Sequence, residues 1–309
     1  MDTSPHKSDF VIVNGVRLHY LDWGGNGNVL LFLAGMGCNA HVFDEFAPRF
    51  TDKFHVMAVT RRGHGESDHP ETGYDIETLT EDLRQFMDVL GIEKAILAGH
   101  SMAHIELSHF SALYPERVLK LVFLDAAYNR TTDSYKNMVA KNPLRQIQPP
   151  DQGRDFYSVE DYFASVKRSY PAMALIWGEA IEAQGWHEVT QTPEGKIIDK
   201  MTEAIEKAIR STLTNYPPED AQIKCPTLSV FATASGRDYI SNDWMSAEQK
   251  VQVLEFFATV NNAWARENVE QFQQNVPQAQ VVVIPDGHHY CFIRQDARVY
   301  KAMRKFLIG

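Results

Sequence analysis

The heptapeptide LAGHSMA, residues 97–103, is the most informative stretch of this chain. It continues the short apolar run that starts at Lys94 and precedes a helical pattern, which predicts a strand that turns sharply into a helix with Ser101 at the apex. Such a turn exposes the serine Oγ at the carboxyl edge of a sheet. Strand and helix approach closely there, so small residues are needed, and the chain has Gly99 and Ala103 at those positions.

The composition is that of a globular protein, with 44% apolar and 23% charged residues in a chain of 309. This length fits one large α/β domain or two small ones. No apolar run is long enough for a transmembrane helix, and residues 1–7 are polar without the apolar core of a signal peptide. We therefore expect a cytoplasmic protein.

The net charge of −10 argues against nucleic-acid and anionic-membrane partners, and it is compatible with a cationic small substrate. The three cysteines, Cys38, Cys225 and Cys291, are odd in number and widely spaced. They form neither a disulfide framework nor a metal-binding pattern, so we expect free thiols. The sequence predicts no cofactor and no metal.

Short apolar runs alternate with helical patterns, which predicts a mostly parallel eight-stranded sheet flanked by helices. Two of these runs, 29–33 and 281–284, are continuously apolar, as strands buried on both faces are. We expect strands near 9–13, 16–22, 28–34, 55–61, 94–99, 119–125, 226–232 and 279–285. We expect helices near 41–49, 76–90, 102–114, 248–274 and 294–307.

The alternation stops after the sixth strand. Residues 127–222 carry three helical patterns, near 158–169, 172–183 and 199–214, and are rich in aromatic residues. We interpret this stretch as a helical cap on a core formed by 1–126 and 223–309. The alternative is a helical layer packed on the edge of the sheet.

Three further segments follow predicted strands in a set order. They are LAGMG at 33–37, RRGHGESD at 61–68 and IPDGHHY at 284–290. Together with the serine turn they resemble the α/β-hydrolase superfamily over almost the whole chain. The resemblance implies an α/β-hydrolase fold with a Ser-His-acid triad and Ser101 as the nucleophile.

The resemblance also assigns the first two segments. A tetrahedral oxyanion needs two N–H donors, and in this fold they come from the residue after the nucleophile, here Met102, and from the loop after the third strand, here Met36. Relatives carry His-Gly in that loop where this chain has Ala-Gly, which leaves only the bracing of the loop uncertain. The second segment is structural in such proteins, so we assign no chemistry to Arg61, Arg62 or His64.

The third segment offers two adjacent histidines as the base that takes the serine proton and returns it to the leaving group. Relatives commonly place the histidine four residues after a proline. Pro285 plus four is His289, so His289 is preferred and His288 remains the alternative. A metal site on this pair is a poor interpretation, because neighbouring side chains diverge and no third ligand is evident.

The acid has two candidates, Asp125 after the sixth strand and Asp238 after the seventh. Most relatives place the acid directly after strand seven, but that register falls on 232–235, where there is no acid, and Asp238 would need a longer loop. Haloalkane dehalogenases place it after strand six, where Asp125 stands without a gap. We prefer Asp125, whose carboxylate at a buried strand end needs a partner; a purely structural Asp125 that caps the turn is a third interpretation.

The stretches 40–48 and 124–128 are similar to a bacterial serine-esterase group, and some proteins similar to that group open macrolide lactone rings. The expected function is therefore hydrolysis of an ester or lactone, without a cofactor, by a monomer or homodimer. An aspartate in place of Ser101 would have indicated a dehalogenase or an epoxide hydrolase. The alternatives are a hydroxynitrile-lyase-like or carbon–carbon-bond-cleaving enzyme, and a non-catalytic ligand receptor.

Overall fold

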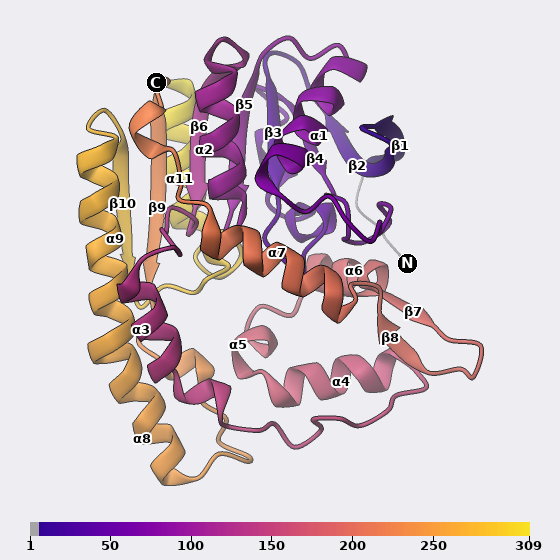
Figure 1. The fold of residues 1–309 in the computed structure, drawn as a ribbon, viewed down its shortest axis with the longest axis vertical. Helices are drawn as coiled ribbons and strands as arrows, with labels where there is room; N and C mark the ends of the chain where they lie inside the picture. The colour runs from indigo at the N-terminus through magenta and orange to yellow at the C-terminus, as the bar shows by residue number, and fades with distance from the viewer. Residues whose placement is uncertain (1–5) are drawn as a thin grey trace.

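The computed structural model describes residues 6–309 and contains an eight-stranded, mostly parallel sheet with helices on both faces (Figure 1). The predicted fold class is confirmed. The strand order is β1-β2-β4-β3-β5-β6-β9-β10. The strands of this sheet are β1 Lys7–Val13, β2 Val16–Gly24, β3 Val29–Leu33, β4 His55–Val59, β5 Ala95–His100, β6 Val118–Leu124, β9 Thr227–Thr233 and β10 Gln280–Pro285.

The first two strands form a hairpin because the turn between them suits a right-handed twist. Asn14 and Gly15 both have positive φ, 45° and 77°, as a type I′ turn requires. β2 pairs antiparallel with β1 and β4, and every later pairing in the sheet is parallel. Parallel strands end at one edge, so the loops that follow them meet there.

Two apolar cores hold the sheet, one on each face. On one face pack the helices α1 Ile76–Val89, α2 Ala103–Leu113 and α9 Asn262–Asn275. The opposite face is covered by η1 Ala40–Phe43, η2 Ala47–Phe50, α10 Cys291–Arg294 and α11 Asp296–Ile308. The predicted helix at 41–49 is thus two 3-10 turns. Pro48, which has no backbone N–H to donate, lies within the second turn.

The predicted helix at 248–274 also differs in detail. It consists of α8 Ala247–Phe256, a π-helical turn at Phe257–Asn261 and α9, in direct succession. A π turn inserts one extra residue per turn and so changes which side chains face the core. Residue periodicity alone does not reveal such an insertion.

The segment between β6 and β9 lies across the carboxyl edge of the sheet (Figure 1). It contains α3 Asp133–Lys141, η4 Pro143–Arg145, α4 Val159–Ser169, α5 Pro171–Ala174, α6 Glu179–Glu188, α7 Glu203–Asn215 and η5 Asp220–Gln222. It also contains an unpredicted hairpin of β7 Val189–Gln191 and β8 Ile197–Asp199, whose three-residue strands are too short for an alternation pattern. The helix expected at 172–183 is divided into α5 and α6.

Two further features concern the cysteines and the length of the helices. The three cysteines are free; Cys38 and Cys291 are buried and Cys225 is half-buried. Over residues 6–309, every helix falls short of the length or the apolar character that crossing a bilayer requires.

Candidate active site

Ser101 lies at the apex of a sharp turn between β5 and α2, and its φ of 56° is in the left-handed region. Strain of this kind persists only where the surrounding structure enforces it, and it is concentrated at functional sites. Gly99 makes the turn possible: a Cβ on it would lie 2.7 Å from the Ala103 Cβ and 2.8 Å from a methyl carbon of Leu107. The serine lines a cavity of about 740 Å³.

The loop after β3 reaches the same cavity. A Cβ on Gly35 would lie 3.0 Å from the Ser101 Cβ, so the absence of a side chain there allows the close approach. Met36 and Met102 line the cavity beside Ser101. Within the described part of the chain, neither of their backbone N–H groups has a hydrogen-bond acceptor. The structure thus brings together the serine and the two amides that the sequence analysis selected.

The loop at 61–68 braces this arrangement. The Arg61 guanidinium donates to the carbonyl of Ala34, in the loop after β3, and to Glu106 in α2 at 2.5 Å. It therefore joins the two segments that carry the amides. Arg62 forms a two-pronged pair with Asp82, with both bonds at 2.6 Å. These contacts agree with the purely structural role expected for this loop.

His289 and Asp125 lie side by side, with the His289 Nδ1 2.7 Å from the Asp125 Oδ2. The other carboxylate oxygen accepts hydrogen bonds from the Tyr128 hydroxyl at 2.5 Å and from the Ala232 N–H at 2.7 Å. Asp125 is nearly buried and has a φ of 46°. A proton held on Nδ1 by this carboxylate leaves Nε2 as a proton acceptor.

The rival residues do not take part in the His289–Asp125 pair. Asp238 makes no hydrogen bond or ion pair with His289, both being described residues. The His288 Nε2 lies 3.0 Å from the Ala172 carbonyl, and its Nδ1 accepts from the Tyr290 N–H at 3.0 Å. Both ring nitrogens are therefore used, and burial lowers the pKa of His288. This histidine tethers its loop to α5.

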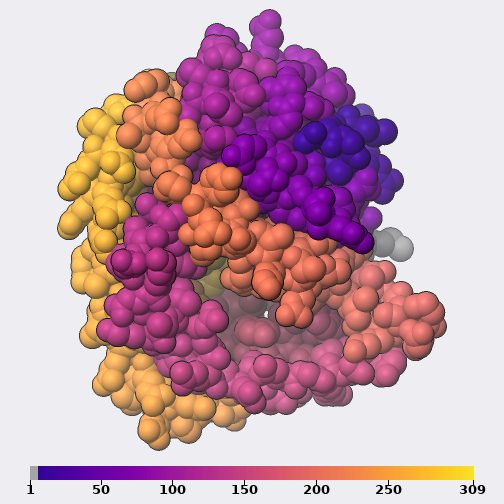
Figure 2. All heavy atoms as spheres, viewed as in Figure 1, coloured from indigo at the N-terminus to yellow at the C-terminus, as the bar shows by residue number. Residues whose placement is uncertain are grey.

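No hydrogen bond joins Ser101 to His289 in this conformation, although both residues are described. Contacts of this type are often loose before a substrate binds. His289 lines a second cavity of about 460 Å³, and Arg145 borders both cavities. The space-filling view shows a hollow on this face, between α7 and the segments of α3 to α5 (Figure 2). Serine and histidine thus each open on a cavity.

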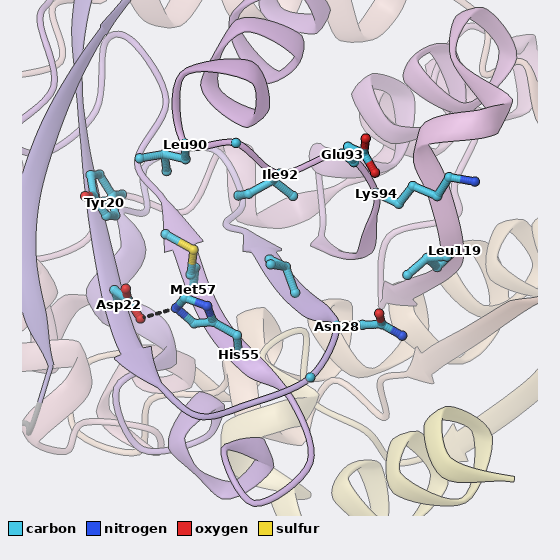
Figure 3. A pocket seen from close by; sticks show the side chains of 13 residues that line it. Tyr20, Asp22, Asn28, His55, Met57, Leu90, Ile92, Glu93, Lys94 and Leu119 are labelled. Carbon is cyan, nitrogen blue, oxygen red and sulfur yellow. Dashed lines mark hydrogen bonds and ion pairs between the residues drawn. The ribbon is translucent and has the colours of Figure 1, made fainter.

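A further cavity of about 570 Å³ lies at the opposite edge of the sheet (Figure 3). Asn28 and His55, at the amino ends of β3 and β4, help to line it, and His55 pairs with Asp22 at 2.8 Å. In parallel sheets ligands bind beyond the carboxyl ends of the strands. This cavity is therefore the weaker candidate.

One group of described residues has the composition of a metal site. Ligand atoms of His6, His41 and Asp44 lie within 4.8 Å of one another, and the His41 Nδ1 is 2.8 Å from an Asp44 oxygen. His41 also stacks on His187, with the ring centroids 4.3 Å apart. None of these residues lines either cavity of the serine site. The group is separate from the chemistry considered below.

The sequence analysis missed two side chains of the site. Tyr128 supports the Asp125 carboxylate, and Arg130 lines the Ser101 cavity. Both follow β6 closely, so their proximity to Asp125 in the sequence was the available signal. Their direction, however, depends on the turn at Asp125.

Sequence and structure comparisons place these features in a family. The sequence model of the alpha/beta hydrolase fold family matches residues 28–296. A relative from Mesorhizobium japonicum, 2-(acetamidomethylene)succinate hydrolase, is 33% identical over 152 residues, which cover 49% of this chain and 53% of the relative. A putative non-heme haloperoxidase of Mycobacterium phage D29 is 36% identical over 38% of this chain and 42% of that protein. The chain spans about half or less of the length of these relatives.

Solved structures share the fold over nearly the full length. The crystal structure of E-2-(acetamidomethylene)succinate hydrolase has a TM-score of 0.75 at 23% identity. The match covers 98% of this chain and the whole of that chain. A Bacillus megaterium epoxide hydrolase has a TM-score of 0.69 at 19% identity and covers 97% of this chain. Several of the sequence relatives are named as hydrolases. With its family model matched over most of its length, the chain belongs to the α/β-hydrolase family.

Proposed function

We propose that this protein is a serine hydrolase that cleaves a carboxylic ester or lactone through an acyl-enzyme. The proposal rests on one arrangement of groups. Ser101, with its strained backbone, lies beside the Met36 and Met102 amides, which have no acceptors among the described residues. On the same edge of the sheet, the His289 Nδ1 lies 2.7 Å from the Asp125 carboxylate. This set of groups supplies what acyl transfer needs, namely a nucleophile, a base with a fixed tautomer and donors for an oxyanion.

In the first half-reaction His289 accepts the Ser101 proton at Nε2 while the serine oxygen attacks the carbonyl carbon. The oxyanion that forms is held by the amides of Met36 and Met102. Asp125 stabilises the imidazolium and keeps the ring oriented. His289 then donates the proton to the leaving alcohol oxygen as the carbon–oxygen bond breaks.

In the second half-reaction water replaces the alcohol. His289 takes a proton from the water, and the resulting hydroxide attacks the acyl carbon. The same two amides hold the second oxyanion. His289 returns the proton to Ser101 as the carboxylic acid is released. The whole reaction therefore converts ester and water into alcohol and acid.

The epoxide hydrolases among the relatives prompt a second comparison. If Ser101 opened an epoxide it would form an ether, which has no carbonyl for water to attack. Turnover would then stop after one cycle. A serine in this position therefore favours acyl chemistry. We propose that the Ser101 cavity and the His289 cavity receive the groups on the two sides of the ester, so that the candidate substrates extend from small esters to a large cyclic ester such as a macrolide.

The proposal is tested with a fluorophosphonate probe and intact-mass measurement. We expect one adduct on the native protein and none on Ser101→Ala or His289→Ala. His288→Ala is the matched control and should still take the adduct. An unlabelled native protein, or a labelled His289→Ala, would refute the mechanism.

A second measurement separates hydrolysis from lyase chemistry on the same residues. Turnover of an ester in ¹⁸O-labelled water should place one labelled oxygen in the acid product. Carbon–carbon or cyanohydrin cleavage that uses the triad only as a base would yield no carboxylic acid with a solvent oxygen.

A further inference from the structure

The cavity of Ser101 has an unusual charge. Four basic residues line it, and none of its described lining residues is an aspartate or glutamate. The basic residues are Arg130, Lys136, Arg145 and Arg210. The whole chain has 40 acidic and only 30 basic residues. The lining of the second cavity, at His289, likewise contains no acid among the described residues. The site is therefore locally positive on a negatively charged protein.

Two of the four cations already have a carboxylate partner on their own helix. Lys136 pairs with Asp133 at 2.9 Å, and Arg210 pairs with Glu206 at 2.7 Å. Both pairs are exposed, and the opposite charges of each pair largely cancel, so these two cations add little to the local potential. Arg145 is exposed at the border of the two cavities.

Arg130 is different. It follows β6 and is half-buried, yet within residues 6–309 it forms no ion pair, and its one hydrogen bond is a 3.4 Å contact with the Tyr128 carbonyl. The Asp125 carboxylate acts on it through space, but both oxygens of Asp125 already accept bonds from other groups. Burial lowers the pKa of Arg130, since a charged guanidinium is costly to desolvate.

The buried arginines of the core show the usual alternative. Arg61 pairs with Glu106 at 2.5 Å, and Arg62 pairs with Asp82 at 2.6 Å. Burying a guanidinium without a carboxylate partner is unfavourable, so charged groups below the surface are normally paired. Arg130 departs from this rule and lines a cavity, where a ligand could supply the partner.

We infer that the substrate carries a carboxylate or an equivalent anion on its acyl side, and that Arg130 binds this group through its planar fork of N–H donors. The inference rests on the proposed function, because it concerns the substrate of Ser101. An anion bound there would hold the neighbouring carbonyl against Ser101, and the aromatic and aliphatic walls of the His289 cavity would receive the rest of the molecule. This charge is opposite to the cationic substrate that the net charge suggested.

The test compares two aryl esters that differ in this charge and in one methyl group. The substrates are the 4-nitrophenyl hemiester of glutaric acid and its methyl-capped neutral analogue, with the spontaneous rates subtracted. We expect the native protein to favour the anionic ester in kcat/KM by about 10-fold or more. In Arg130→Gln most of this preference should be lost, because one charge-assisted hydrogen-bond pair accounts for about 10- to 100-fold. Arg130→Lys should keep part of it.

Arg266→Gln is the matched control. Arg266 is an exposed arginine of α9 that lines neither cavity, so its loss removes the same charge without touching the site. The preference for the anionic ester should be unchanged in this variant. A loss as large as that in Arg130→Gln would mean that only the overall charge matters, and would overturn the role of Arg130.

The native protein alone also decides the question, should Arg130→Gln fail to fold. If neither ester turns over, protection of Ser101 from the fluorophosphonate by glutarate is compared with protection by glutaramide. Stronger protection by glutarate supports the inference. Equal protection overturns the inference. So does a kcat/KM for the anionic ester that is no higher than that for the neutral ester, in a protein that takes the probe. In both cases the proposed serine-hydrolase function still holds. A native protein that takes no probe instead contradicts the proposed function itself.

Discussion

Replacement of Asp125 by asparagine is the sharpest test of the triad geometry. Asp125 accepts three hydrogen bonds, from His289, Tyr128 and the Ala232 N–H. An asparagine keeps one acceptor oxygen, which the Tyr128 and Ala232 donors would hold in place. Its NH2 group would then face the His289 Nδ1 and turn that nitrogen into an acceptor. The ring proton then lies on Nε2, and Nε2 can no longer accept the proton of Ser101.

The expected loss follows from this tautomer change. A triad hydrolase with the wrong histidine tautomer loses about 10⁴ in kcat, or about 5 kcal/mol of transition-state stabilisation. The fold should persist, because the new asparagine retains two of the three contacts at the end of β6. We would measure kcat on an activated ester, the rate of fluorophosphonate labelling and the melting temperature. Labelling should slow together with kcat while the melting temperature changes by only a few degrees.

Asp238→Asn provides the matched control, since it makes the same change in the other acid that the sequence offered. It should keep kcat within a few-fold of the native value. The opposite result, in which Asp238→Asn loses activity and Asp125→Asn does not, would refute the geometry described above. It would mean that the His289 loop rearranges toward β9 in the active protein.

Two further predictions concern stability. In Gly99→Ala the new methyl group would lie 2.7 Å from the Ala103 Cβ and 2.8 Å from Leu107, so overpacking should lower the free energy of unfolding by about 1–3 kcal/mol in urea titrations; no change would mean that β5 and α2 are not so closely packed. Burial lowers the pKa of His64 to about 3 from the usual 6.5, so the unfolded chain binds the proton more readily and stability is lost as the pH falls below 6.5. Between pH 7 and 5, His64→Gln should therefore lose about 2 kcal/mol less than the native protein, and parallel profiles would contradict a neutral buried His64.

The sheet could be predicted from the sequence because its signals are local. Apolar runs such as 29–33 and the Asn14-Gly15 turn reflect backbone conformation and burial within a few residues. The eight predicted strands all occur, with ends within two residues or so of the expected ones. The segment from 127 to 222 was less predictable. Two of its three expected helices occur, as α4 and α7, but the helix at 172–183 is divided, and neither α3 nor the hairpin of three-residue strands was expected.

The site divides in the same way. Ser101 was selected because the elbow is a local motif, and the structure places Met36 and Met102 beside it. The choice between Asp125 and Asp238 depends on how two loops, far apart in the chain, meet the loop of His289. Composition and periodicity do not contain that distance, whereas the 2.7 Å contact between His289 and Asp125 gives it directly.

The net charge of the chain and the lining of the Ser101 cavity favour ligands of opposite sign. Coulomb interactions between exposed groups are screened over about 8–10 Å in physiological salt, so the surplus of acidic residues elsewhere has little effect inside a cavity. An arginine that is half-buried and unpaired acts at hydrogen-bond distance, where screening is weak. The sign of a ligand is therefore set by the few side chains that line its site. We therefore expect Arg130, rather than the surplus of carboxylates elsewhere, to set the charge of the ligand, and the pair of esters measures this preference.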